Sequence, residues 1–84
     1  MITHVAIIYR GELYSLPKPN RHHHIIREIH LKTGDGDIFG EQGFLDDQGN
    51  FLDRPAALIH ARECGQLLPE RPLWDDWLYS ENIW

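Results

Sequence analysis

The sequence predicts an α+β fold, in which two β-hairpins form a small antiparallel sheet and two helices pack on it. Two stretches rich in β-branched or aromatic residues each contain turn-forming residues. Each of these stretches is followed by a segment with apolar residues at helical spacing. At 84 residues, with 42% hydrophobic and 25% charged residues, the chain has the size and composition of one globular domain, residues 1–84.

The first hairpin is expected near the N-terminus. Residues 2–10 are rich in β-branched side chains, and Gly11 can supply the turn into a second strand at residues 13–16. Pro17 and Pro19 should end that strand, because proline has no N–H to donate to a sheet.

The first helix is predicted over residues 21–33. Asn20 is the expected N-cap, and Gly34 should end the helix. The buried stripe is expected to consist of three isoleucines, Ile25, Ile26 and Ile29.

The second hairpin is expected at residues 43–52, where two apolar pairs flank a tip of turn-forming residues. Asp53 should then cap a second helix that has Pro55 in its first turn and runs to about Cys64, with Gly65 ending it.

The C-terminal residues 73–84 form an aromatic tail, which is too apolar to remain in water. Such a tail either folds back over the core or packs on another chain. Because a chain of 84 residues has a small core, we expect a homodimer or higher homo-oligomer sealed by the tail. The large tail residues are Trp74, Trp77, Tyr79 and Trp84.

Composition excludes several classes of protein. A net charge of −5 disfavours a protein that binds duplex nucleic acid. The single cysteine, Cys64, cannot form an internal disulfide, so a small disulfide-stapled secreted scaffold is excluded. Neither a signal peptide nor a membrane-spanning apolar stretch is expected.

Arg21 and His22 are the first candidate site, at the N-terminus of the first predicted helix. The helix dipole favours an anion there, and arginine can donate two hydrogen bonds to a phosphate. Consecutive helical residues are about 100° apart, so the three histidines at 22–24 cannot all face one ligand, and Arg21 and His22 are better candidates than His23. A solvated polar first turn is the alternative. As a first-turn residue, Arg21 is expected to matter for binding and little for stability.

Gln42, Gly43 and Phe44 are the second candidate site. A glycine beside an aromatic ring allows a flat ligand to approach, and a glutamine amide can both donate and accept hydrogen bonds at a base edge. The alternative is the start of a strand with Phe44 in the core. Arg54 is a further candidate for an anion, or it pairs with one of the abundant acidic residues.

A metal site is not expected. His60 and Cys64 have helical i,i+4 spacing and would need two more ligands, such as His24 and His30, but no metal-binding motif supports them. No nucleophile motif is evident, so neither an enzyme nor a cofactor is expected.

Several motifs together resemble the first Thoeris anti-defence family, the phage "sponge" proteins. They are Arg21-His22-x-x-Ile25-Ile26, Gly40-Glu41-Gln42-Gly43-Phe44-Leu45, Gly49-x-Phe51-Leu52-Asp53-Arg54, Ala57 to Gly65-Gln66, and Leu78 to Trp84. The resemblance implies a small sheet with helices, a dimer, and capture of a cyclic ADP-ribose-type signal at the subunit interface without cleavage. Related sponges hold other immune nucleotides.

Carried over to this chain, the resemblance implies that Arg21 and His22 face phosphate and that Arg54 is a second phosphate contact. It also implies contacts to base or ribose from Gln42, Gly43 and Phe44. His23, His24 and the stretch 73–77 depart from the family pattern.

The expected function is therefore sequestration of a nucleotide immune signal in the cytoplasm of a host bacterium by a phage-type anti-defence protein. The main alternative is an acidic interaction protein that inhibits a host defence protein directly or mimics nucleic acid. A small enzyme that cleaves the nucleotide is a third.

Overall fold

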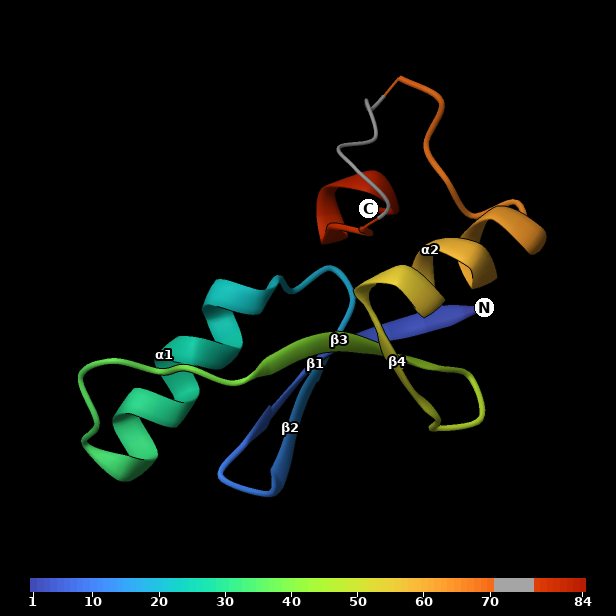
Figure 1. Ribbon diagram of the computed structural model, residues 1–84. Coiled ribbons are helices and arrows are strands. Elements are labelled where there is room, and N and C mark those ends of the chain that lie inside the picture. Colours follow the sequence, from blue (N-terminus) through green and yellow to red (C-terminus); the bar gives the residue numbers. More distant parts are fainter. Residues whose placement is uncertain (71–76) are drawn as a thin grey trace.

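The computed structural model describes residues 1–70 and 77–84, and it confirms the α+β fold (Figure 1). The sheet is antiparallel, with strand order β2-β1-β3-β4. The elements in chain order are β1 (Ile2–Tyr9), β2 (Glu12–Pro17), α1 (His22–Thr33), β3 (Glu41–Asp46), β4 (Phe51–Asp53), α2 (Arg54–Glu63) and the 3₁₀ turn η1 (Ser80–Asn82).

The first hairpin is confirmed, and its turn matches the twist of the strands. Arg10 and Gly11 both have positive φ, at 52° and 76°, as a two-residue turn of type I′ requires. The strand that follows, β2, lies at one edge of the sheet. The strand β1 pairs with β2 on one side and with β3 on the other, so β1 is a central strand.

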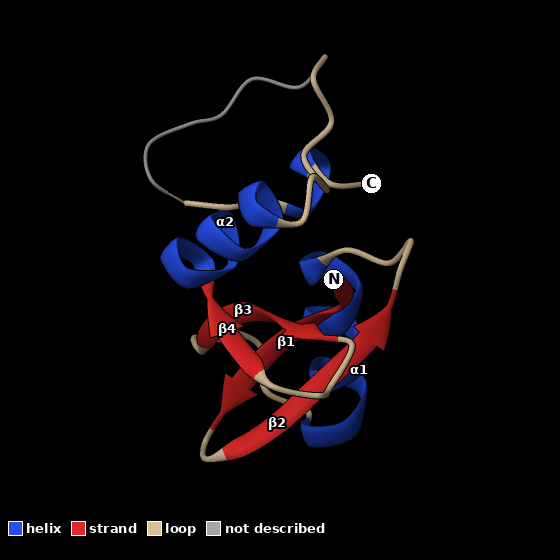
Figure 2. Cartoon of the chain, turned by 90° about the vertical axis from the view of Figure 1, so that its right-hand side faces the viewer, coloured by secondary structure: helices blue, strands red, loops and turns tan. Residues whose placement is uncertain are grey.

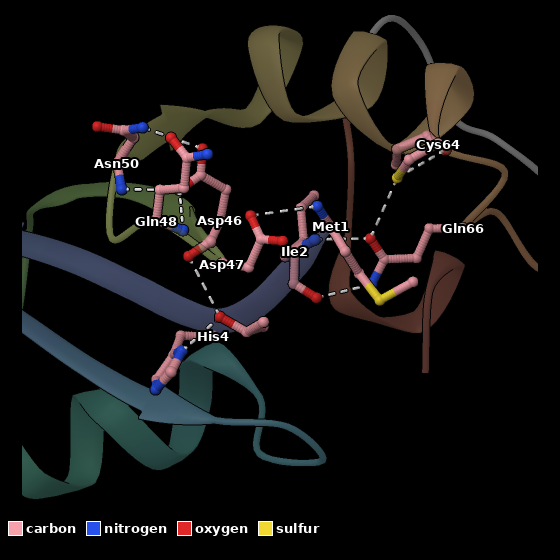
Figure 3. A network of polar contacts seen from close by, with 11 residues as sticks. Met1, Ile2, His4, Asp46, Asp47, Gln48, Asn50, Cys64 and Gln66 are labelled. Atoms are coloured by element: carbon pink, nitrogen blue, oxygen red, sulfur yellow. Dashed lines mark hydrogen bonds and ion pairs between the residues drawn. The ribbon is translucent and has the colours of Figure 1, made fainter.

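The second hairpin is also confirmed. Its turn is held by the Asp46 carboxylate, which accepts hydrogen bonds from the backbone N–H groups of Gln48 (2.9 Å) and Asn50 (2.8 Å) (Figure 3). The strand β3 needs a glycine at position 43, because a Cβ there would overlap the Leu52 carbonyl oxygen and the Phe51 ring.

The N-cap of α1 is Arg21, so the expected cap at Asn20 is wrong. The Asn20 side chain instead donates to the Pro17 carbonyl oxygen (2.8 Å). The first turn is closed by His24, whose Nδ1 accepts from the Arg21 N–H (2.9 Å). Gly34 ends the helix in the left-handed conformation, as expected.

The expected cap of α2 is confirmed: Asp53 Oδ1 accepts from the Ala56 N–H (2.9 Å). After the helix, the Gln66 side chain pairs with the backbone of β1. Its Nε2 donates to the Ile2 carbonyl oxygen (2.7 Å), and its Oε1 accepts from the Ile2 N–H (2.8 Å) (Figure 3).

One hydrophobic core joins both helices to the sheet. The first helix lies on the β1–β2 half and α2 on the β3–β4 half, and Figure 2 shows α2 above the strands with α1 behind them. Alternate residues of β1 face this core. The buried members are Ile2, Val5, Ile7, Tyr9, Ile25, Ile29, Phe44, Ala57, Leu58, Ala61, Leu78 and Ile83.

The described part of the aromatic tail folds back onto its own chain. Leu78 is fully buried and Ile83 is 6% exposed, both within the core, and Trp84 packs against it. The Trp84 indole Nε1 donates to the Asn20 carbonyl oxygen (2.9 Å). Residues 73–76 of the expected tail, including Trp74, lie outside the described residues. Dimerisation stays a prediction.

Candidate functional site

The six residues proposed from the sequence do not lie in one site, and Arg21 is already engaged inside the chain. Its Nη1 donates to Ser80 Oγ (3.1 Å) and its Nη2 to the Trp84 carbonyl oxygen (2.7 Å), with Glu81 at 4.0 Å. Arg21 thus holds the C-terminal segment, residues 77–84, against the start of α1. These contacts give Arg21 a structural role, contrary to the expectation that this residue matters little for stability.

His22 is buried between α1 and the sheet. Its ring lies edge-on to Phe44 with 5.0 Å between centroids, and Nε2 is 2.7 Å from the Gly43 carbonyl oxygen. Burial lowers the pKa of His22 to about 4, so the ring is neutral at pH 7 and Nε2–H is the donor. In this position His22 ties α1 to β3, and it carries no charge to offer a phosphate.

Gly43 and Phe44 belong to the packed interior of β3. Phe44 is fully buried, and Gly43 is covered by the β4 backbone and the Phe51 ring. The structure therefore matches the alternative interpretation of this segment, a strand with Phe44 in the core. Neither residue presents a surface on which a base can stack.

Gln42 and Arg54, in contrast, come together. Arg54 Nη2 donates to Gln42 Oε1, and Arg54 Nη1 donates to the Leu78 carbonyl oxygen (2.6 Å). The guanidinium carbon lies 4.8 Å from the Tyr79 ring centroid, within range of a cation–π contact. Burial lowers the pKa of the Arg54 guanidinium below its usual range. Arginine side chains stay protonated in proteins at neutral pH.

These two residues line a cavity of about 340 Å³ at the point where β4 passes into α2 and β3 begins. The C-terminal segment contributes Trp77 to the lining of this cavity, and Trp77 is 51% exposed. Its place is set by the neighbouring Leu78, whose N–H donates to the Arg54 carbonyl oxygen (3.2 Å). The lining residues are Gly40, Glu41, Gln42, Asp53, Arg54, Pro55 and Trp77.

Three lining residues were not predicted as site residues from the sequence: Glu41, Asp53 and Trp77. Trp77 was assigned to a subunit interface together with the rest of the aromatic tail, and Asp53 was recognised only as a helix cap. The signal that could have found Trp77 is its large ring beside an acidic pair, Asp75-Asp76, in a segment where a core residue would be expected to have apolar neighbours.

The histidines and the cysteine do not converge. In residues 1–70 and 77–84, no group of three or more His, Cys, Asp or Glu side chains could hold a metal ion. Cys64 Sγ lies 3.7 Å from Gln66 Oε1, and His60 Nε2 is buried without a hydrogen-bond partner among the described atoms. Across the same parts of the chain, no helix is long and apolar enough to cross a membrane.

Comparison with known protein families gives a match that covers the whole chain. The sequence model of the family described as "Phage T4 y16D protein" matches residues 1–84. No curated protein and no solved structure matches significantly. The match supports a phage protein and does not specifically support the Thoeris anti-defence family that the motifs resemble. The chain belongs to the phage T4 y16D protein family.

Proposed function

We propose that this phage protein binds a small nucleotide signal in the cavity between β3, α2 and Trp77, and holds it without cleaving it. The observation that supports the proposal is the cavity itself, in which Gln42, Arg54 and Trp77 converge. Its volume of about 340 Å³ is at the lower end of the range for small-ligand sites.

The chemistry of the lining supports a nucleotide over an apolar ligand. The half-exposed Trp77 ring offers a face on which a base can stack, a contact that is worth roughly 1–3 kcal/mol in other base-binding proteins. The Gln42 Oε1 accepts from Arg54, which orients the amide and leaves Nε2 as a donor toward a base edge.

Holding the ligand is favoured over covalent chemistry. The described residues that line the cavity contribute no hydroxyl, thiol, amine or imidazole, which are the groups that most often act as nucleophiles. Of the two lining carboxylates, Asp53 is engaged as the cap of α2, which leaves Glu41. The anti-defence role, the capture of an immune signal in the host cytoplasm, rests on the motif resemblance, and the family match is to a phage protein.

The test is depletion of ligand from solution. Purified protein is incubated with a panel of cyclic ADP-ribose isomers, ADP-ribose and cyclic oligonucleotides, and the bound fraction is recovered by heat denaturation. We expect at least one compound to be depleted and then released intact. Release of an altered product would indicate an enzyme, and no depletion by any compound would favour the acidic interaction protein.

Two variants locate the site. Trp77→Ala and Gln42→Ala should each weaken capture by about tenfold, a loss of about 1.4 kcal/mol. Their controls are Leu31→Ala, which removes an exposed apolar side chain from α1, and Gln48→Ala, which removes an amide at the second hairpin. Unchanged capture by both site variants would contradict the proposed location.

A further inference from the structure

We infer that the nucleoside end of the ligand enters this cavity and that its phosphates remain outside in solvent. The inference rests on the proposed function and specifies which part of a nucleotide is recognised. It depends on the charges of the lining residues, on the hydrogen bonds that Arg54 already makes, and on the way α2 begins.

The lining is acidic on balance. It contains two carboxylates, Glu41 and Asp53, against one cation, Arg54. The Arg54 guanidinium already donates to the Leu78 carbonyl oxygen and to Gln42 Oε1, and it stacks on Tyr79. A diphosphate placed here would meet two like charges, and both terminal nitrogens of the one cation already donate to groups of the protein.

The start of α2 also offers an anion fewer N–H groups than an uncapped helix N-terminus. A helix N-terminus binds phosphate through its free N–H groups. In α2 the Ala56 N–H is taken by the Asp53 carboxylate, and Pro55 has no N–H. The cap therefore supplies its own negative charge at the place where a phosphate would otherwise bind.

The same groups suit a nucleoside. Carboxylates accept hydrogen bonds from ribose hydroxyls, the role that an acidic residue plays in many dinucleotide sites. Glu41 is exposed, and Asp53 uses one oxygen, Oδ1, for the cap. With the base on Trp77 and its edge at Gln42, the ribose would lie toward the carboxylates and the phosphates toward solvent.

The experiment compares ligands that differ only in phosphate content. Calorimetry on the full chain would use the four ribonucleosides, their 5′-monophosphates and 5′-diphosphates, ADP-ribose and inorganic pyrophosphate. We expect at least one nucleoside to bind within about threefold of its mono- and diphosphate, and its 2′,3′-dideoxy form to bind about tenfold more weakly. Pyrophosphate should not compete.

Variants that remove a negative charge provide a second test of the inference. Glu41→Gln should weaken nucleoside binding by about fivefold, whereas Glu28→Gln on the exposed face of α1 should leave it unchanged. Affinity that rises about tenfold with each phosphate, competition by pyrophosphate, or tighter binding by Glu41→Gln would each overturn this inference and leave the proposed function standing. If nothing in this panel binds while a cyclic nucleotide is depleted from solution, this inference alone is overturned; if neither panel contains a ligand, both are overturned.

Discussion

His22 carries a pH-dependent part of the stability, because burial against Phe44 and β3 lowers its pKa to about 4. The unfolded chain, with an ordinary pKa near 6.5, binds more protons than the folded chain between these values. The contribution is therefore complete above about pH 6.5 and is lost as the pH falls toward 4. A shift of this size is worth about 3 kcal/mol.

Urea unfolding at a series of pH values between 7.5 and 4 would measure this loss. In His22→Gln, which keeps a side-chain donor without a titrating ring, the stability should vary with pH by about 3 kcal/mol less over the same range. His23→Gln is the matched control, since His23 is exposed in the same turn of α1. A profile for His22→Gln that overlays the parent would contradict the assignment.

The contacts of individual site candidates could not be predicted from the sequence. The elements that carry Arg21, His22 and Phe44 were predicted correctly, but not whether these side chains face a ligand or neighbouring residues. That choice depends on contacts distant in sequence, such as Arg21 with Trp84 and His22 with Gly43. Gln42 and Arg54 do line a cavity, since β3 and the start of α2 are neighbours in the fold.

Most elements were predictable because their signals are local. Turn glycines, prolines and the Asp53 cap act within a few residues, so both hairpins and both helices were located to within one or two positions. The cap at Asn20 was predicted wrongly because the local signal of this residue was misleading. Its side chain bonds to Pro17, and the first turn of α1 is closed by an imidazole, a group that is uncommon in caps.

At the level of elements, Arg21 connects α1 to the C-terminal segment through Ser80 and Trp84. Removing the guanidinium leaves a carbonyl and a hydroxyl without their donor, and a hydrogen bond from a charged group is worth about 1.5–3 kcal/mol. Arg21→Ala should therefore lower the free energy of unfolding by about 1–3 kcal/mol, which urea titration would measure.

Arg21→Lys should restore only part of this stability, because one ammonium cannot reach both acceptors with the geometry of a guanidinium. Arg27→Ala, on an exposed position of α1, is the control and should have little effect. If Arg21→Ala were as stable as the Arg27 variant, the C-terminal segment would not depend on this contact.

Across the whole molecule, the C-terminal segment is part of the core and not an appendage to it. Leu78 is fully buried in the cluster that joins both helices to the sheet, and its backbone pairs with Arg54 in both directions. The cavity depends on this arrangement, since Leu78 sets the place of Trp77. A domain of this size has a total stability of about 4–13 kcal/mol, so one core residue can decide whether it folds.

Leu78→Ala should remove about 2–5 kcal/mol, the usual cost of a cavity left by a buried leucine. The expected result is a large fall in the urea midpoint, or loss of a cooperative transition followed by circular dichroism. Leu31→Ala is the matched control: Leu31 is 69% exposed on α1, so its loss should change stability by less than about 0.5 kcal/mol. Equal stability of the two variants would mean that residues 1–70 form a sufficient core on their own and that the C-terminal segment only covers it.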